Sequence, residues 1–217
     1  MAGYRGIIFD LDGTLLDSVE DIGDSMNEVL KKLDFPTWSY KEYKMKIGGG
    51  FRGLAINCLP EDADEEIIEK AVKMFSDFYD ENYLNKTRPF NGIMNVLNEL
   101  KNQEIKLGVN SNKRDDYTKA LVDKYFNKIP FIKVYGDREG IIKKPDPTSA
   151  LEIAKYMNLG VKEILYIGDS NVDILTAKNA NMDSAGVLWG FRDREELLNY
   201  GAKFIIEKPI DILNLIK

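Results

Sequence analysis

The sequence contains no histidine and only one cysteine among its 217 residues. The absence of histidine excludes nucleophiles activated by imidazole, the His-Glu-x-x-His zinc site and every imidazole acid or base. A single cysteine, Cys58, allows neither an intramolecular disulfide nor a cysteine-rich zinc site, and we expect it to be a buried structural thiol. Any chemistry must therefore use carboxylates, hydroxyls and lysine.

Two further absences limit the partners. The formal net charge is -6, so the chain lacks the excess of Lys and Arg that binding to a nucleic acid backbone requires. No apolar run approaches the roughly 20 residues of a membrane-spanning helix, and the amino terminus lacks the pattern of a signal peptide. The sequence predicts a cytoplasmic protein that binds neither nucleic acid nor membrane, with a 44% hydrophobic content that suffices for a core.

The most informative segment that is present is the run IIFDLDGTLLD at residues 7–17. An apolar stretch gives way to Asp10 and Asp12 and then to a turn at Gly13. A strand that ends there delivers both carboxylates to the carboxyl edge of a parallel sheet, where the sites of open α/β folds lie. Taken alone, the pair also fits a fragment of a calcium loop or an Asx turn.

The pattern of apolar residues predicts an α/β unit that is interrupted by helices. Helical periodicity covers residues 18–33, 41–59 and 65–83. Later strands are predicted at 106–109, 131–135, 163–167, 184–188 and 202–206, and further helices at 92–101, 115–125, 147–157, 173–179 and 210–216. The alternation predicts a parallel sheet with right-handed crossovers. The helical block leaves from the edge that carries the Asp pair, so it is placed to act as a lid.

Two later segments add groups that suit a phosphate. Ser111 and Asn112 follow the strand at 106–109, where backbone N–H groups and a hydroxyl can bind an oxyanion, although such residues also serve as plain helix caps. Lys144 precedes Pro145, and the prolines on both sides of Asp146 restrict the backbone and aim the lysine. The alternative for Lys144 is a solvated surface side chain.

The segment ILYIGDSNVD at residues 164–173 repeats the logic of the opening motif, with an apolar strand followed by carboxylates. Since parallel strands end at one edge, we expect Asp10, Asp12, Asp169 and Asp173 to meet in space. Crowded carboxylates repel one another unless a cation lies among them. Oxygen ligands without histidine or cysteine favour a hard ion, and few protein ligands with retained water favour Mg²⁺.

In this order, the four segments resemble the motifs of the haloacid dehalogenase-like hydrolase superfamily. The matching residues are DLDGT at 10–14, Ser111 with Asn112, Lys144 with Pro145, and Gly168-Asp169-Ser170 followed by Asp173. The resemblance covers essentially the whole chain. It implies an α/β fold: a Rossmann-like parallel sheet core made of residues 1–16 and 87–217, with an inserted all-helical cap domain of residues 17–86.

The resemblance also implies a phosphohydrolase mechanism. Asp10 is then the nucleophile that forms an aspartyl-phosphate, and Asp12 protonates the leaving oxygen and later deprotonates the attacking water. Ser111 and Lys144 hold the phosphoryl group. The remaining implied phosphate contacts are Gly13, Thr14 and Asn112, and the implied Mg²⁺ ligands are Asp10, the Asp12 carbonyl and Asp169, with Asp173 in support.

Three segments look like the phosphoglycolate phosphatase branch of this superfamily: residues 17–22, 46–54 and 186–192. Backbone N–H groups at Gly49 and the guanidinium of Arg52 are expected to contact a substrate anion, and a flexible turn between two helices is an equally weighted alternative. We expect Trp189 and Phe191 to be packing residues. The partner implied is a small phosphorylated metabolite, bound by a monomer or a homodimer.

Other activities are weighed against this one. A phosphosugar mutase of the β-phosphoglucomutase type keeps both Asp residues, but members of that branch share a cap histidine that this chain lacks. Nucleotides and pyrophosphate stay open as substrates because the cap has no decisive signature. Dehalogenases and phosphonatases depart from a carboxylate at the position of Asp12. Intact Asp10, Asp12, Lys144 and Asp169 argue against a non-catalytic relative.

Overall fold

The computed structural model describes residues 3–216 and divides into two compact units. One unit runs to Leu16 and resumes at Pro89, and the other consists of Asp17–Arg88. We call them the α/β unit and the helical unit. The chain passes between them at two short strands, β2 (Leu16–Asp17) and β3 (Arg88–Pro89), which pair as a two-stranded ribbon.

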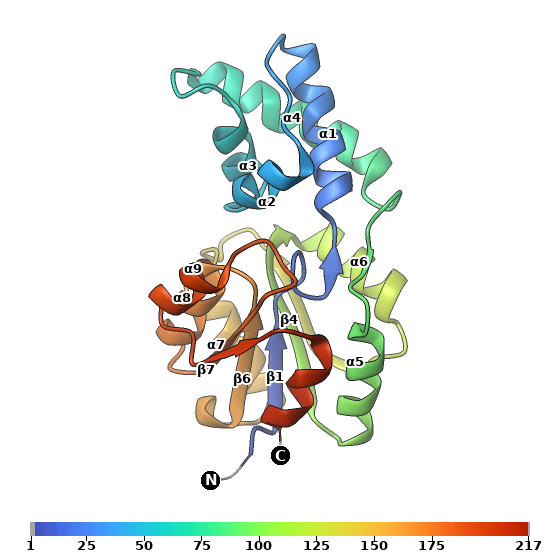
Figure 1. The fold of residues 1–217 in the computed structure, drawn as a ribbon, viewed down its shortest axis with the longest axis vertical. Coiled ribbons are helices and arrows are strands. Elements are labelled where there is room, and N and C mark those ends of the chain that lie inside the picture. Colours follow the sequence, from blue (N-terminus) through green and yellow to red (C-terminus); the bar gives the residue numbers. More distant parts are fainter. Residues whose placement is uncertain (1–2, 217) are drawn as a thin grey trace. The chain divides into compact units, whose positions relative to one another are not determined.

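The α/β unit contains a six-stranded sheet in the order β5-β4-β1-β6-β7-β8, in which neighbouring strands run parallel (Figure 1). This arrangement confirms the predicted parallel α/β fold. The strands are β1 (Gly6–Phe9), β4 (Lys106–Arg114), β5 (Phe131–Asp137), β6 (Ile164–Gly168), β7 (Asp183–Val187) and β8 (Phe204–Ile206). β1 lies at the centre, and its four residues are fully buried or nearly so, as expected for a strand covered on both faces.

The register of the central strands decides where the functional side chains lie. Phe9 at the end of β1 is aligned with Val109 of β4 and with Ile167 of β6. In the sheet, β4 lies on one side of β1 and β6 on the other, so the order of the strands along the chain changes direction at β1. Residues that follow these three strands therefore leave the sheet at one level, beside a topological switch point.

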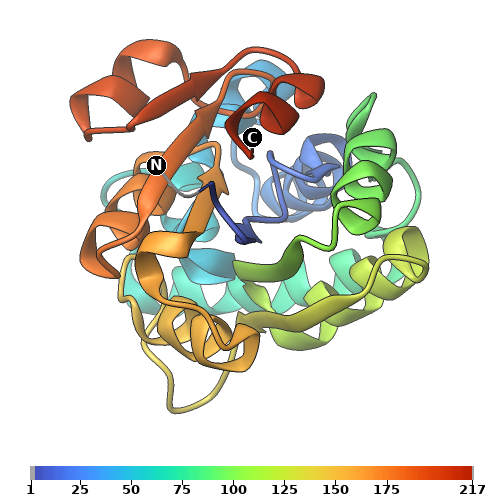
Figure 2. The same ribbon diagram turned by 90° about the horizontal axis from the view of Figure 1, so that it is seen from below.

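Helices cover both faces of this sheet (Figure 2). On one face, residues of α7 (Thr148–Met157) and α8 (Asn171–Asn179) pack with Ile8 and Tyr166 in a buried apolar cluster. On the other face, α5 (Ile93–Asn102) packs against the closing 3-10 segment η2 (Pro209–Leu215). The remaining elements are α6 (Asp115–Phe126), the 3-10 turn η1 (Val161–Glu163) and α9 (Arg194–Asn199).

Three details of the α/β unit differ from the sequence prediction. The strand predicted at 106–109 continues to Arg114, with an irregular register beyond Asn110. Helix α9 was not predicted, although Asp193 caps it by accepting a hydrogen bond from the backbone N–H of Glu196. The one or two closing helical turns expected at 210–216 are present as a 3-10 helix that begins one residue earlier, at Pro209. Each difference concerns short or polar segments, where apolar periodicity carries little information.

The helical unit consists of α1 (Val19–Lys32), α2 (Tyr40–Lys46), α3 (Gly50–Cys58) and α4 (Glu65–Asn82). Its core is aromatic: the Phe75 ring contacts the rings of Phe51 and Tyr79, at centroid distances of 4.7 and 5.2 Å. Cys58 is buried, as predicted, and burial raises the pKa of its thiol to about 12. Among residues 3–216, no helix is long and apolar enough to cross a membrane.

The helical stretch predicted at 41–59 is divided by a turn at its glycine cluster, which separates α2 from α3, as in the alternative of a turn between two helices. Gly48, Gly49 and Gly50 all have positive φ, with Gly49 at 70° as the N-cap of α3. Residues other than glycine adopt this conformation at a steric cost, so three consecutive glycines favour a turn over a continuous helix. A Cβ on Gly53 would lie 2.4 Å from the Gly48 carbonyl oxygen, so the turn packs closely against α3.

Candidate active site

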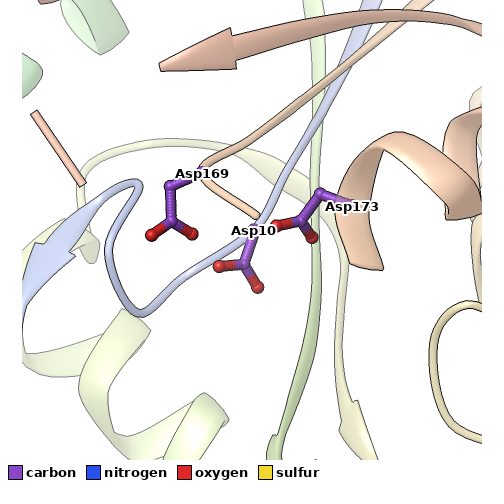
Figure 3. A group of neighbouring side chains, drawn as sticks. All are labelled: Asp10, Asp169 and Asp173. Atoms are coloured by element: carbon purple, nitrogen blue, oxygen red, sulfur yellow. The ribbon is translucent and has the colours of Figure 1, made fainter. Parts of the chain in front are cut away.

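Three carboxylates converge at the carboxyl edge of the sheet (Figure 3). Asp10 directly follows β1, Asp169 directly follows β6, and Asp173 lies in the first turn of α8. One oxygen from each of the three lies within 4.8 Å of the other two, and all three residues are buried. The strand register thus places Asp10 beside two carboxylates that are more than 150 positions away in the sequence.

A lysine from a fourth segment is inserted into this cluster. The Lys144 Nζ donates to Asp10 Oδ1 at 2.6 Å and to Asp173 Oδ1 at 2.7 Å. The three side chains retain only 6, 8 and 1% of their exposure, respectively. One ammonium group therefore bridges two carboxylates, and Asp169 completes the group with a further negative charge.

Burial and mutual repulsion govern the ionisation of this cluster. Burial raises the pKa of Asp10 to about 7, against the opposing charge of Lys144, and the neighbouring Asp173 raises it further. Burial, then the charges of Asp10 and Asp173, hold the pKa of Asp169 well above its ordinary value. For Lys144, burial lowers the pKa, but the two carboxylates outweigh burial and raise it well above the usual range. The cluster holds more carboxylates than its one lysine can neutralise.

Two glycines allow the loops to approach Asp169. Gly13 has a φ of 87°, and a Cβ there would lie 2.2 Å from Asp169 Oδ2. A Cβ on Gly190 would lie 2.3 Å from the Asp169 Cβ. The backbone N–H of Phe191 donates to Asp169 Oδ2 at 2.7 Å, which orients the carboxylate. Side chains at either glycine would displace Asp169, so the glycines serve the geometry of the cluster.

The polar residues at the end of β4 support Lys144 from the side. The Asn112 amide forms two hydrogen bonds with the Lys144 backbone: Lys144 N donates to Asn112 Oδ1 at 2.9 Å, and Asn112 Nδ2 donates to Lys144 O at 3.1 Å. Ser111 is buried, and its Oγ accepts a hydrogen bond from Lys113 N at 3.2 Å. Asn112 therefore fixes the segment from which the lysine reaches the cluster.

The second carboxylate of the opening motif has a separate partner. Lys113 Nζ donates to Asp12 Oδ2 at 2.8 Å. The Lys113 side chain is 3% exposed and the Asp12 side chain 14%. Asp10 and Asp12, two positions apart, are thus paired with different lysines from different segments.

Comparison with known proteins assigns this arrangement to a family. A family model for haloacid dehalogenase-like hydrolases matches residues 7–187. The chain belongs to the haloacid dehalogenase-like hydrolase family. It is similar to proteins named phosphoglycolate phosphatase from Aquifex aeolicus, with 34% identity over 97% of this chain and 96% of that protein, and from Psychrobacter arcticus, with 31% identity over 90% and 85%. A crystal structure named as a predicted phosphoglycolate phosphatase from Haemophilus somnus superposes with a TM-score of 0.91 at 26% identity, covering 100% of each chain.

Within this hydrolase, the structure brings together four residues that the sequence singled out: Asp10, Lys144, Asp169 and Asp173. Asp12 enters the same edge, but its carboxylate lies outside the three-carboxylate group and pairs with Lys113. Asn112 holds the Lys144 backbone, as described above, and Ser111 lines the same small pocket as Lys144. Thr14 is fully buried, and its carbonyl oxygen accepts a hydrogen bond from Trp189 Nε1.

The residues of the cluster fit a divalent cation. All donors are carboxylate oxygens and they lie close enough to share one ion. Burial, followed by the charges of neighbouring carboxylates, raises the pKa of Asp10 and of Asp169, and a bound cation would offset both effects. Such oxygen-only sets suit hard cations. Asp173 already accepts hydrogen bonds from Lys144 and from the Ser170 hydroxyl, so Asp10 and Asp169 have the fewer competing donors.

Sequence reasoning missed Lys113. A signal was present, since Lys113 stands two positions after Ser111 in an extended segment, and alternate residues of a strand share a face. The substrate contacts predicted for Gly49 and Arg52 in the helical unit stay predictions. Gly49 is exposed at the start of α3, and the Arg52 guanidinium pairs with Glu65 and Glu69 of α4.

Proposed function

We propose that this hydrolase is a Mg²⁺-dependent phosphatase that cleaves a small phosphate monoester through a phosphorylated Asp10. The observation that carries the proposal is the placement of Asp10, with a lysine ammonium 2.6 Å from one carboxylate oxygen and two further carboxylates beside it. A carboxylate that attacks a phosphate meets like-charge repulsion. A neighbouring ammonium offsets this repulsion and stabilises charge on the transferring oxygens.

In the first step, an Asp10 oxygen attacks phosphorus, and the bond from phosphorus to the ester oxygen breaks. Asp12 gives its proton to the departing oxygen, so the leaving group departs as an alcohol. Lys144 contacts Asp10 throughout, and Ser111 stands at the same edge, where its hydroxyl is proposed to hold the phosphoryl group. Asp10 then carries the phosphoryl group as an acyl phosphate.

In the second step, water attacks the phosphorus of the acyl phosphate. Asp12 is now a carboxylate and takes a proton from the attacking water, while the bond between phosphorus and the Asp10 oxygen breaks. Inorganic phosphate leaves, and both aspartates return to their starting states. One carboxylate thus serves first as acid and then as base, which explains how the chemistry proceeds without histidine.

Asp10, the Asp12 carbonyl and Asp169 are the residues proposed to hold Mg²⁺, with Asp173 supporting through Lys144 and Ser170. When bound there, the ion neutralises charge on the phosphate and on the crowded carboxylates. The excess of buried carboxylates supports this assignment. We propose that the ion bound there is Mg²⁺ and not another hard cation.

The proposed substrate is 2-phosphoglycolate. The support comes from the relatives named phosphoglycolate phosphatase that match nearly the whole chain. The helical unit is proposed to select the leaving group, with Gly49 as a predicted contact. The second predicted contact, Arg52, pairs with Glu65 and Glu69, so we expect it to contribute little to binding. The protein is proposed to act in the cytoplasm, as a monomer or a homodimer.

The test is the initial rate of phosphate release from a panel that contains 2-phosphoglycolate, sugar phosphates, nucleotides and pyrophosphate, each with Mg²⁺ and with EDTA. We expect release that depends on Mg²⁺ and is fastest for 2-phosphoglycolate. A preference for another compound would replace the substrate and keep the reaction. No release, with conversion of β-glucose 1-phosphate to its isomer, would replace hydrolysis by a mutase reaction.

A further inference from the structure

The pair formed by Lys113 and Asp12 has features of a built contact. Its distance is 2.8 Å, and the lysine side chain is almost completely withdrawn from water. A buried ammonium is costly unless a carboxylate pairs with it, so the partner of Lys113 is part of its structural role. Exposed ion pairs of this chain, such as that of Lys31 with Glu28, lack this burial.

The backbone that carries Lys113 is held from several directions. The Thr118 hydroxyl donates to the Lys113 carbonyl at 3.1 Å, and Lys113 N donates to Ser111 Oγ. A Cβ on Gly136 of β5 would lie 2.5 Å from that same carbonyl oxygen, so only a glycine allows β5 to come this close. Gly136 N also donates to Asp115 Oδ1 at 2.9 Å. The starting point of the lysine side chain is therefore fixed.

The two lysines divide the two carboxylates of the opening motif between them. Lys144 contacts Asp10 and Asp173, while Lys113 contacts Asp12. A carboxylate two positions from Asp10 has a competing attraction toward the positive charge of Lys144. A separate cation that holds Asp12 Oδ2 fixes the plane of the whole carboxyl group, including Oδ1.

We propose that Lys113 is a positioning residue, which holds the Asp12 carboxyl group in the orientation that proton transfer to and from the reacting oxygen requires. The proposal rests on the proposed phosphatase function. Lys113 keeps its own proton in both steps. Asp12 gives its proton to the ester oxygen as the bond from phosphorus to that oxygen breaks, and it recovers one from water in the second step.

The test compares two substrates with leaving groups of different acidity. The alcohol leaving group of 2-phosphoglycolate needs a proton, whereas the nitrophenolate of 4-nitrophenyl phosphate departs without one. If Lys113 positions the acid, Lys113→Met lowers kcat/KM for 2-phosphoglycolate by about 100-fold, within the range of general acid catalysis. The value for 4-nitrophenyl phosphate falls by less than about 5-fold, because the acid contributes little there.

Three further variants complete the design. Asp12→Asn should show the same substrate discrimination, and the double variant with Lys113→Met should lose little more than Asp12→Asn alone. Lys106→Met is the matched control. Lys106 begins the same strand and donates to the Met157 carbonyl, so its loss should leave the ratio of the two kcat/KM values unchanged.

Several results would overturn the proposal. An equal loss on both substrates, or losses that add in the double variant, would assign Lys113 a general structural role. A rise in KM alone, equal for both substrates, would make it a phosphate ligand. If Lys113→Met does not fold, Lys113→Gln is measured in its place with the same two substrates. Absence of phosphate release by the wild-type protein from either substrate would instead refute the phosphatase function itself.

Discussion

Two clusters of charged side chains, one in each unit of this hydrolase, differ in their burial. In the α/β unit, Lys144, Asp10 and Asp173 pair with less than a tenth of each side chain exposed. In the helical unit, Arg52 pairs with Glu65 and Glu69, and these side chains are 43, 69 and 61% exposed. An ion pair in the buried cluster therefore has a large desolvation cost, whereas the exposed pairs of Arg52 have almost none.

The difference indicates what each group of charges contributes. Exposed pairs are screened by water and add at most about 1 kcal/mol to stability, so they can be exchanged with little effect. The buried cluster combines an excess of carboxylates with a single lysine, which opposes folding and suits a reaction that develops and transfers charge. We therefore expect substitutions in the cluster to separate activity from stability, and substitutions in the exposed pairs of the helical unit to have small effects on both.

The largest effect is expected for Asp10→Asn. Without the nucleophile, phosphatase activity should fall by at least about 1,000-fold, measured as phosphate release from 2-phosphoglycolate with Mg²⁺. The free energy of unfolding in EDTA at pH 8 should stay equal or rise, because the variant removes one buried negative charge and leaves Lys144 paired with Asp173.

The pH dependence of stability provides a second readout of Asp10→Asn. Burial raises the pKa of Asp10 from 3.8 to about 7, so between these values the folded protein binds more protons than the unfolded chain. The contribution of Asp10 to the free energy of unfolding of the metal-free protein therefore falls as the pH rises through that window. The variant should lose this part of the dependence. Asp123→Asn, on the exposed side of α6, is the control and should change neither activity nor stability.

An intermediate effect is expected in the aromatic core of the helical unit. Phe75 is 1% exposed and stacks on Tyr79. Phe75→Ala should lower the free energy of unfolding of this unit by about 3–5 kcal/mol, because it leaves a cavity. Urea unfolding followed by the fluorescence of Trp38, in a Trp189→Phe background, measures the helical unit. Trp189, in a Trp38→Phe background, measures the α/β unit.

The two tryptophan readouts decide whether the units are independent. If they unfold separately, Phe75→Ala shifts the Trp38 transition and leaves the Trp189 transition in place. Equal shifts of both would contradict the independence of the units and make them one cooperative body. Met45→Ala, at a side chain 61% exposed in the same unit, should change stability by no more than about 0.5 kcal/mol.

The same contrast explains how far the sequence alone could predict this molecule. Asp10 and Asp169 were predictable because each follows an apolar strand, and parallel strands end at one edge. Lys113 and Asp12 are 101 positions apart, so their pairing depends on the register of β1 and β4, which no local pattern specifies.

In the helical unit, local signals predict the helices and the break between two of them. The three glycines at 48–50 favour a turn, and the chain turns there between α2 and α3. The contacts of Arg52 could not be predicted, because long exposed side chains have many partners of similar energy within reach. The sequence therefore predicts which residues follow the strands better than it predicts the partners of long charged side chains.

The smallest effect is expected for Arg52→Ala, which tests that exposed contact directly. Its guanidinium is engaged by two glutamates of α4, so stability should fall by less than about 1 kcal/mol. For the same reason, KM for 2-phosphoglycolate should stay within about twofold, since a lost charge-assisted hydrogen bond to substrate would cost far more. Arg194→Ala, an equally exposed arginine of the α/β unit paired with Glu207, is the matched control. A tenfold rise in KM for 2-phosphoglycolate, without a rise for 4-nitrophenyl phosphate, would show that Arg52 leaves its glutamates to bind the substrate carboxylate, and the helical unit would then contribute to catalysis as well as to stability.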